Sequence, residues 1–437
     1  MTTFAESITV ADLDRDPYPI YARLRKEAPV AYVPAVNLWL VTRAEDVEFV
    51  TTHPDLFTAQ VSDSTLDRSF KGKSLLTMDG EEHLNMRKSL DSKYRPRTVS
   101  TYIDDLVTPI AKNQLSEIVS NDRRELVTSY FEPISVLGLG AVLGLGHLSA
   151  ETMQHWFHGL AMGATNFERD PEKQKISDAV EAEMNDELLP IMERLLKTPD
   201  DSTMSHMLHS GMAPGEHRTA EYVLPTLKLT ILGGMQEPGH GAAATFFALA
   251  NIPGAFVRLR ENPDLWDDVI QEGLRWIAPI GTQTRQTTQD VELGGVVIPA
   301  GSAVAAVVAS ASRDETVFSD PDTFDMDRPR QSNASFGYGP HFCAGHAFAR
   351  GLERISLQVS SDPALAAMRV QDPDLVTLAL SKHDDNLWKA FSIALTHLLG
   401  EGKSALALRW LLGQALHPIN AQQSRAQAEA ITGIANL

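Results

Sequence analysis

Cysteine is nearly absent from this sequence, which has one cysteine, Cys343, among its 437 residues. A single cysteine cannot form an intramolecular disulfide, cannot provide a CxxC metal pair and cannot hold an iron–sulfur cluster. Long hydrophobic runs are absent as well, because the most apolar stretches, YVLPTLKLTILGG and GAAATFFALANIPGAF, are separated by MQEPGH and each falls short of the ~20 residues that span a bilayer. We therefore expect no internal disulfide and no membrane partner.

An excess of positive charge is missing too. Lys and Arg number 38 against 57 Asp and Glu, which gives a formal charge of −19. Because basic clusters supply the affinity for nucleic acids and anionic membranes, this balance disfavours both, although NMRKSLDSKYRPR at 85–97 is a local basic segment. The opening MTTFAESITVADLDRDPYPIY has no basic region followed by an apolar run, so we expect a cytoplasmic protein.

Helical periodicity is what the sequence has in abundance. Hydrophobic residues make up 43% of the chain, which is enough to bury a large core. Helical patterns cover about 81–96, 99–120, 127–145, 150–166 and 172–197, whereas VAYVP, LWLVT and the β-branched runs within 290–314 indicate small sheets. We predict one mainly α-helical domain with small β-sheets over 1–358, followed by a segment with a helical pattern, 359–437, that carries no chemistry we can name.

The cysteine lies in a glycine-spaced loop, SFGYGPHFCAGHAF at 335–348, directly before a helical pattern. Gly337 and Gly339 permit a tight backbone path through this loop. A helix N-terminus after Cys343 would favour the thiolate over the thiol, because the macrodipole and the free amides stabilise negative charge there. The pattern therefore predicts an activated, anionic sulfur.

The residues alone leave four readings of this cysteine open. It could be a small buried core residue, a zinc ligand together with His341 and His346, a nucleophile, or an axial ligand of haem iron. The zinc reading lacks an obvious fourth ligand, and a nucleophile needs a base that the sequence cannot place. A dinucleotide-binding loop is excluded, since GxGxxG would need a glycine where the chain has Phe342.

FGYGPHFCAG resembles FGxGxHxCxG, the haem-thiolate loop of the cytochrome P450 monooxygenases, at every fixed position. The resemblance implies a cytochrome P450 fold with haem b held between a central bent helix and the helix that follows the loop. It implies that Cys343 is the axial iron ligand and that Phe336, Gly337 and Gly345 lie against the porphyrin. Dioxygen would then be a substrate.

Two further groups of residues gain meaning from this resemblance. Glu272 and Arg275 in QEGLRW lie three apart on one predicted helix face, a spacing that alone is typical of a surface ion pair. In the resembling family such a pair joins a further arginine, matched here by Arg328, and the three brace the structure beneath the cysteine loop. The resemblance also implies that the haem propionates are held by His83, Arg87, Arg285 and His341. Guanidinium and imidazolium groups suit carboxylates through charge-assisted hydrogen bonds.

The segment LKLTILGGMQEPGHGAAATFFALAN at 227–251 is apolar and helical on both sides of an interruption. A loop between two helices would fit, and so would one long helix kinked at Pro238, which has no N–H and crowds the carbonyl of Gly234. The resemblance implies the kinked helix, with its bend beside the iron. The usual acid–threonine pair of the family is missing, so we expect Glu237 or Gln236 to deliver protons.

GGMQEPGHG is similar to the bacterial aromatic O-demethylases of this family, which convert guaiacol-type methoxyphenols to catechols and formaldehyde. The similarity extends to about residue 358 and stops there. It places the following residues at the substrate: Phe70, Ala164, Ile231, Gly234, Ile280 and Thr284. Where the branch can carry a phenylalanine, this chain has Ala164, so we expect room for an alkyl group opposite the hydroxyl.

Electrons have to come from a partner protein, because the chain has no flavin or iron–sulfur motif. The resemblance implies NADH as their source, through a separate flavin and iron–sulfur reductase or a ferredoxin. Benzoates, fatty acids and terpenes are the alternative substrates. A haem-binding protein with impaired turnover is a second reading, because 359–437 lacks the short sheet that normally enters the pocket.

Overall fold

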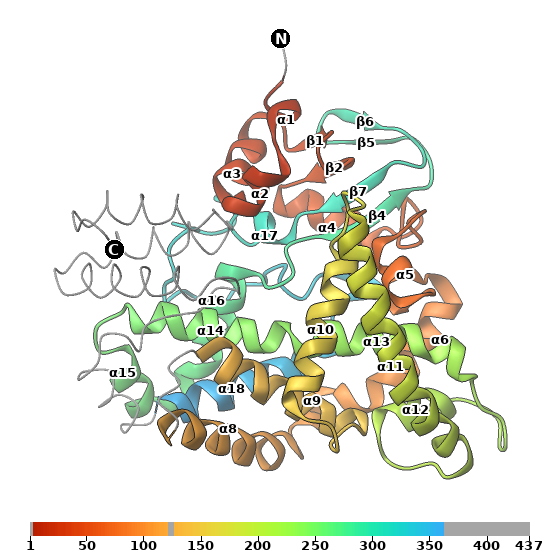
Figure 1. Ribbon diagram of the computed structural model, residues 1–437. Helices are drawn as coiled ribbons and strands as arrows, with labels where there is room; N and C mark the ends of the chain where they lie inside the picture. The colour runs from red at the N-terminus through yellow and green to blue at the C-terminus, as the bar shows by residue number, and fades with distance from the viewer. Residues whose placement is uncertain (1–2, 121–125, 362–437) are drawn as a thin grey trace.

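Helices build most of the protein, and small sheets lie at one end of it beside the N-terminal helices (Figure 1). The computed structural model describes residues 3–120 and 126–361. This mainly helical architecture with small sheets confirms the predicted fold class. The predicted C-terminal segment, 359–437, lies outside the described residues except for its first three positions.

The elements have the following bounds. The α-helices are α1 (Phe4–Ser7), α2 (Val10–Arg15), α3 (Pro17–Glu27), α4 (Ala44–Thr52), α5 (Thr65–Phe70), α6 (Gly80–Tyr94), α7 (Pro96–Val99), α8 (Ile103–Ser120), α9 (Glu132–Leu143), α10 (Ala150–Ala164), α11 (Pro171–Lys197), α12 (Thr203–His209), α13 (Ala220–Met235), α14 (Glu237–Ala250), α15 (Ala255–Glu261), α16 (Trp266–Ile277), α17 (Val308–Ala311) and α18 (His346–Ser360). The 3-10 turns are η1 (Leu75–Thr77), η3 (Pro263–Leu265) and η4 (Gly339–His341), and η2 (Val127–Phe131) is a π-helical turn. The strands are β1 (Val30–Val33), β2 (Leu38–Val41), β3 (Phe57–Thr58), β4 (Gln283–Thr287), β5 (Val291–Leu293), β6 (Val296–Ile298) and β7 (Ala303–Ala306).

The larger sheet joins segments that are far apart in the sequence. Its strand order is β1-β2-β7-β4-β3, with β2 and β7 parallel and the other neighbours antiparallel. β4 pairs Thr284 with Ala305 and Arg285 with Val304. The sheet therefore fixes the backbone of Arg285, whose side chain is buried.

The segment 290–314 departs in part from its predicted β structure. β5 and β6 form the expected hairpin, and the glycines at 294–295 make its turn with φ of 58° and 79°. Residues Val308–Ala311 are helical instead. Ala306 is paired with Val41, the last residue of β2, so the chain beyond β7 has no strand to pair with and turns on itself.

The segment 227–251 forms one long helix that is interrupted at Gln236, between α13 and α14. Backbone hydrogen bonds continue across the interruption, since the N–H of His240 bonds to the carbonyl of Gln236 at 3.1 Å. Pro238 lies in the first turn of α14 and has no N–H to offer Gly234. The kinked helix, rather than a loop between two helices, is therefore the structure adopted.

α14 lies in the middle of the helical body and packs against α9, η2, α16 and α18 (Figure 1). The apolar side chains of these elements belong to one buried core cluster. Glycines allow the backbones to approach closely, because a Cβ at Gly241 would lie only 2.9 Å from Oε1 of Glu353 in α18. The bend is thus held on several sides by packed helices.

Within residues 3–120 and 126–361, no single helix is both long and apolar enough to cross a bilayer. By length and composition alone, the bent pair Ala220–Ala250 and Ala255–Glu261, which meet at 108°, passes the same criterion. Most residues of α13 and α14 are buried against the surrounding helices.

Candidate active site

The cysteine loop runs from η4 to the start of α18. The backbone N–H of Cys343 bonds to the carbonyl of Phe336 at 2.9 Å, and the carbonyl of Cys343 lies 3.0 Å from Nδ1 of His346. These contacts fix the backbone on both sides of the sulfur.

Glycines at two positions of this loop are required by the backbone. Gly337 and Gly339 have φ of 71° and 67°, in the left-handed region that favours glycine. A Cβ at Gly339 would lie 2.6 Å from the carbonyl oxygen of Thr51, and a Cβ at Gly337 would clash with the side chain of Gln283. The loop is therefore pressed against α4 on one side and β4 on the other.

Free space lies beside the sulfur of Cys343. A Cβ at Gly345 would meet no atom within 4 Å except this sulfur, at 3.9 Å. Burial raises the pKa of the Cys343 thiol, although the N–H groups of Gly345 and His346 and the charge of Arg87 act in the opposite direction. Without a cation beside the sulfur, the predicted anionic form is therefore not favoured, because desolvation of the charge outweighs the effect of the helix N-terminus. A cation at the sulfur would supply the missing stabilisation.

The zinc reading of the loop finds no support in the structure. Among the described residues, no group of three or more His, Cys, Asp and Glu side chains is arranged to hold a metal ion. His346 instead faces the carbonyl of Cys343 and the ring of Phe342. Cys343 is therefore the one metal-ligating side chain that the loop offers without a partner in the described part of the chain.

Two buried imidazoles stack next to this loop. His83 of α6 and His341 of η4 have ring centroids 4.2 Å apart, and Nε2 of His341 lies 3.4 Å from Oδ1 of Asp79. Burial, together with the nearby charges of His341 and Arg87, lowers the pKa of His83 to about 4. Burial also lowers the pKa of His341, against the pull of Asp79. Both rings are therefore neutral at pH 7, and the single N–H of His341 lies on Nε2, towards Asp79.

Arg285 of β4 lies close enough to act electrostatically on His341. Its Nη1 donates to the carbonyl of Thr284 at 2.7 Å, and burial lowers its pKa to about 10. Nη2 of Arg285, Nε2 of His83 and Nδ1 of His341 are buried without a hydrogen-bond partner in the described part of the chain. Buried polar atoms left without partners are rare and costly. Arg285 and His83 can donate an N–H to the propionate carboxylates of a haem, and a carboxylate at Nδ1 of His341 would favour a second proton on that ring. The residues present therefore fit a haem.

Arg87 is placed differently from the other predicted propionate residues. It lies one turn after His83 on α6, as the sequence predicts, but its Nε donates to Asp91 at 2.6 Å. Its Nη1 donates to the carbonyl of Phe342 at 2.7 Å. Arg87 thereby ties α6 to the cysteine loop and lowers the pKa of Cys343 through its charge.

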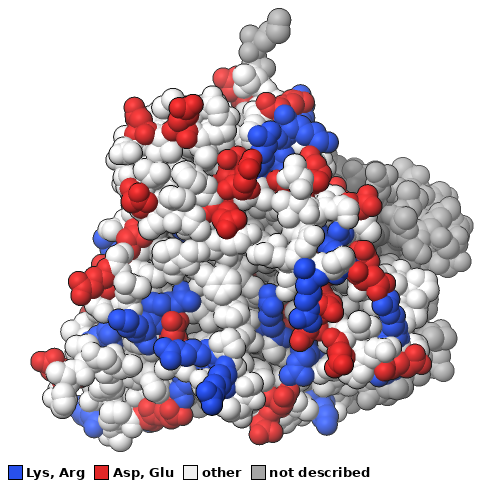
Figure 2. Space-filling model, turned by 180° about the vertical axis from the view of Figure 1, so that it is seen from behind, with Lys and Arg blue, Asp and Glu red and all other residues white. Residues whose placement is uncertain are grey.

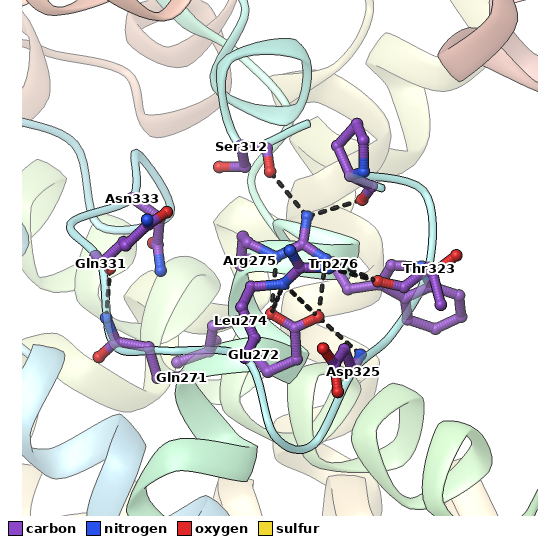
Figure 3. A network of polar contacts seen from close by, with 12 residues as sticks. Gln271, Glu272, Leu274, Arg275, Trp276, Ser312, Thr323, Asp325, Gln331 and Asn333 are labelled. Carbon is purple, nitrogen blue, oxygen red and sulfur yellow. Dashed lines mark hydrogen bonds and ion pairs between the residues drawn. The ribbon is translucent and has the colours of Figure 1, made fainter. Parts of the chain in front are cut away.

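Glu272, Arg275 and Arg328 form one buried ion network, most of which is drawn in Figure 3. Arg275 donates to both carboxylate oxygens of Glu272, at 2.7 and 2.8 Å, and Nε of Arg328 lies 3.0–3.1 Å from the same oxygens. Arg275 also donates to the carbonyls of Ser312, Pro321 and Thr323. The network pins the segment after α17 to α16.

Neighbouring residues of α16 carry this anchor to the chain that leads into the cysteine loop. Nε2 of Gln271 donates to the carbonyl of Gln331 at 2.7 Å (Figure 3). Ser335, directly before Phe336, donates its hydroxyl to the carbonyl of Leu274 at 2.7 Å. The network on α16 is thus connected to the loop by short polar contacts.

The bend of the central helix presents a carboxyl group with unusual properties. Oε2 of Glu237 is buried and has no hydrogen-bond partner among the described residues. It lies over Gly233, where a Cβ would be 3.9 Å from it. Burial raises the pKa of Glu237 to about 7. A carboxyl group that titrates near neutral pH is suited to proton transfer, whereas Gln236 does not titrate.

The predicted substrate residues divide into two groups. Phe70, Ala164 and Ile231 are buried on α5, α10 and α13, which pack against one another. Gly234 packs closely against α9, because a Cβ there would lie 2.6 Å from Cδ2 of Leu139. Its placement at the substrate stays a prediction.

Ile280 and Thr284 lie on the other side, near the sheet. Ile280 is exposed and Thr284 is half-buried beside Arg285 in β4. A separate pocket of about 450 Å³ lies between α5 and the start of α11 and is lined by Arg68, Lys71, Asn166, Arg169, Pro171 and Gln174. Its cations are already paired with Asp63 and Asp178, so it offers no free charge to an anionic ligand.

Asp79 and Gln283 belong to this site and carry no recognisable motif in the sequence. Asp79 accepts from the N–H of Ala59 at 2.8 Å and from Thr58, in addition to its contact with His341. Gln283 fills the space beside Gly337. Their partners come from distant segments, so no local pattern could have revealed them.

Comparisons with known proteins agree with this geometry. The family model described as "Cytochrome P450" matches residues 258–355. Cytochrome P450 109 of Bacillus spizizenii is 29% identical over 347 residues, covering 78% of this chain and 82% of that protein. A methyl-branched lipid omega-hydroxylase of Mycobacterium tuberculosis is 27% identical over 380 residues, covering 82% and 85%. The crystal structure of the enzyme CYP109B1 from Bacillus subtilis superposes with a TM-score of 0.68 at 26% identity, covering 80% of this chain and 93% of that one.

Proposed function

Because this chain belongs to the cytochrome P450 family of monooxygenases, we propose that it removes the methyl group of a methoxyphenol such as guaiacol or a 4-alkylguaiacol. The haem of this family, held by a cysteine thiolate, activates dioxygen so that one oxygen atom enters a C–H bond. The similarity of GGMQEPGHG to the aromatic O-demethylases is the observation that carries the choice of substrate.

The overall reaction balances without a further reactant. The methoxyphenol, dioxygen, two electrons and two protons yield a catechol, formaldehyde and water. Oxygen enters the methoxy carbon, and the hemiacetal formed then breaks its C–O bond, with the hydroxyl proton passing to the phenol oxygen. The protein has to hold the haem, place the methyl group, supply protons and admit electrons.

The haem would be held from two sides. Cys343 would supply the thiolate ligand of the haem iron, and the absence of a side chain at Gly345 would leave room beside the sulfur. The imidazole of His83 and the guanidinium of Arg285 would donate their unpartnered N–H groups to the propionates, and His341 would do so from Nδ1 when its ring carries a second proton. Phe336 and Gly337 form the wall of the loop on the cysteine side, and Arg87 keeps that loop against α6.

Glu237 is the residue that we assign to proton supply at the bend. With a pKa of about 7 its carboxyl is about half protonated at neutral pH, and its free Oε2 can give a proton to the space beside the haem. Its position in the first turn of α14, at the interrupted backbone, is where the family's usual acid–threonine pair would act. Gln236 would orient water there without exchanging its own proton.

The apolar wall formed by Phe70, Ala164 and Ile231 would hold the aromatic ring. The methyl side chain of Ala164 occupies less volume than a phenylalanine, so an alkyl substituent on the ring can be accommodated next to it. Thr284 and Ile280 would face the ring from the side of the sheet. We assign the substrate class to uncharged aromatic ethers, because these residues carry no charge.

An electron-transfer partner would dock where positive charge adjoins the cysteine loop. Lys and Arg side chains gather on the lower half of the face shown in Figure 2. Lys88 of α6 and Arg95 and Arg97 at α7 are exposed, and α6 is joined to the loop by Arg87. We propose that an acidic surface of a reductase or ferredoxin, supplied with electrons by NADH, binds there.

A binding titration followed by a product assay tests this function. Guaiacol, 4-propylguaiacol, 4-methoxybenzoate and a long-chain fatty acid are each added to the purified haem protein, and the haem spectrum is followed. We expect tight binding of both guaiacols and, with NADH and a reductase, one formaldehyde released per catechol formed. Binding and hydroxylation of the fatty acid alone, as the lipid-hydroxylating relative would suggest, would overturn the aromatic substrate. Haem binding without turnover of any ether would overturn the O-demethylase activity itself.

A further inference from the structure

His240 lies one turn after Glu237 on α14 and makes a contact that the reaction described above does not use. Its Nε2 is 2.8 Å from Oε1 of Glu132, the first residue of α9, and the Glu132 side chain is 1% exposed. Residues three apart on a helix share a face, so His240 lies next to Glu237. The charged form of His240 lowers the pKa of Glu237, which shows that the two groups are close enough to interact.

Gly239 makes this contact possible. A Cβ at position 239 would lie 3.0 Å from the carbonyl oxygen of Phe131 and 3.3 Å from Cα of Glu132. Glycine therefore lets the backbone of α14 approach the junction of η2 and α9. The π-helical turn η2 ends immediately before Glu132, and such turns occur frequently at functional sites. Within EPGHG, the carboxyl of Glu237, the close backbone contact at Gly239 and the imidazole of His240 therefore all lie at the bend beside Glu132.

The same carboxylate also meets a second histidine. Nε2 of His158 in α10 lies 3.4 Å from Oε2 of Glu132, which accepts a further bond from Nε2 of Gln154 at 2.7 Å. The side chains of His158 and His240 are 30% and 35% exposed, whereas the carboxylate between them is not exposed. The cluster therefore connects groups in contact with solvent to the buried end of Glu237.

The hydrogen bonds keep Glu132 ionised. Burial alone would raise its pKa, but the bonds from His158, His240 and Gln154 outweigh burial and hold the pKa well below its ordinary value. Because Nε2–H of His240 donates to the carboxylate of Glu132, Nδ1 is the ring nitrogen that is left to exchange a proton. An imidazole held in this way can both accept a proton from solvent and give one away.

We propose that His240, positioned by Glu132, restores the proton of Glu237 after each proton that Glu237 gives up, so that the three residues form a supply line from solvent. This inference rests on the proposed proton-donating function of Glu237. His158 and Gln154 hold the carboxylate of Glu132 in place. His240 and Glu132 act through Glu237 and are positioning residues, not groups that touch the substrate.

The proton transfers balance. A hydrated proton from solvent forms an N–H bond at Nδ1 of His240, while Nε2–H continues to donate to Glu132. That Nδ1–H bond then breaks as an O–H bond forms on the Glu237 carboxylate. His240 returns to its neutral form and Glu132 stays ionised throughout, so the net change is one proton moved from solvent to Glu237.

The test compares the turnover of guaiacol by the same haem protein with two different oxidant systems. In the first, dioxygen and NADH with a reductase convert guaiacol, which requires protons from solvent; in the second, hydrogen peroxide replaces them and brings both protons itself. We expect His240→Gln to lower the NADH-driven rate about tenfold and to leave the peroxide-driven rate within about twofold. The control is His155→Gln, because His155 forms an imidazole–carboxylate pair with Glu183 on the same helix as His158 but away from the bend.

A second readout does not depend on turnover. In the ferrous carbon monoxide state, NMR of histidines labelled with ¹⁵N in the ring should show His240 as the Nε2–H tautomer in the unchanged protein. This preference should be lost in Glu132→Gln, while the ring resonances of His155 should not change. Glu237→Gln separates this inference from the proposed function on which it rests.

If Glu237→Gln does not lower NADH-driven turnover, then both the proton-donating function of Glu237 and the supply line are refuted. If it lowers turnover but His240→Gln behaves like His155→Gln, Glu237 stands and the supply line is refuted. Equal loss in both driven reactions would mean that His240 acts only structurally, which also refutes it.

Discussion

At Arg285 the fold buries a guanidinium group of which one nitrogen has no partner. The depression of its pKa to about 10 by burial reflects how strongly the surroundings disfavour the charge. A haem propionate would remove this cost by supplying a carboxylate. The same residue should therefore destabilise the haem-free chain and stabilise the haem complex.

Replacing Arg285 by Met separates these two effects. We expect Arg285→Met to stabilise the haem-free protein by about 1–3 kcal/mol, because an unpaired buried charge is removed. The rate of haem loss to an acceptor protein should rise roughly tenfold, because a charge-assisted bond to a propionate is lost. Urea unfolding and haem transfer measure the two. Arg68→Met, at a half-buried residue that is paired with Asp63, is the matched control, and equal haem loss in both variants would contradict the assignment.

Glu132 should give the protein a stability that depends on pH. The pKa of its carboxyl lies well below the ordinary value in the folded state, so its contribution is fully present above the unfolded value of about 4.5 and is lost as the pH falls through the folded value. We expect Glu132→Gln to lower the free energy of unfolding by about 2–4 kcal/mol at pH 7, because bonds to a charged acceptor are removed. Urea unfolding between pH 7 and pH 3 should show the difference between the two proteins shrinking below about pH 4.5. A constant difference across this range would rule out ionised Glu132 as its source.

At the scale of elements, the bend of α13 and α14 depends on how closely α14 approaches its neighbours. Gly239 meets the backbone of Phe131 and Glu132, Gly241 meets Glu353, and Gly234 meets Leu139. A glycine on each of these faces allows one helix to pack tightly against two others. Moving the helix at any one contact would shift Glu237 relative to the cysteine loop.

Gly239→Ala tests this packing. Its Cβ would lie 3.0–3.3 Å from backbone atoms, which cannot rotate away, so α14 would have to move from α9. We expect a loss of about 1–3 kcal/mol in the free energy of unfolding, together with a weaker His240–Glu132 contact. Gly146→Ala is the control, because its Cβ would meet only Cα of Ala141 at an ordinary 3.8 Å. Equal stability of the two variants would show that the close approach is not needed.

The sequence predicts those parts of the site whose geometry is local. The cysteine loop, the spacing of Glu272 and Arg275 and the kinked helix all follow from short patterns, because backbone conformation and helical spacing are set within a few residues. Contacts between distant segments could not be read in this way: Asp79 meets His341, and Glu132 meets His240, only after the helices pack. The close packing of Gly234 against Leu139 could not be read from the sequence for the same reason, because Leu139 lies on a distant helix.

The whole molecule carries a formal charge of −19, and yet Lys and Arg side chains are frequent on the lower half of the face drawn in Figure 2, with Asp and Glu among them. Among the described residues, no ion pair involves Lys88, Arg95 or Arg97, whereas the cations lining the pocket at α5 are paired. Phe342, on the cysteine loop, is 38% exposed and bonded through its carbonyl to Arg87. These cations therefore lie on and next to α6, the helix that Arg87 joins to the cysteine loop, in a molecule whose net charge is negative.

Reversing two of these charges should weaken electron delivery without altering the haem. We expect the double variant Lys88→Glu/Arg95→Glu to raise the KM for an acidic ferredoxin or reductase severalfold at low salt, because exposed opposite charges steer association. The difference from the unchanged protein should disappear above about 0.5 M salt, where the Debye length is only a few ångströms. Lys175→Glu is the control, because it reverses the charge of an exposed lysine on α11, away from α6 and α7. Guaiacol binding should be unchanged in both variants. Equal KM values for the double variant and for Lys175→Glu would show that the partner does not dock at α6 and α7.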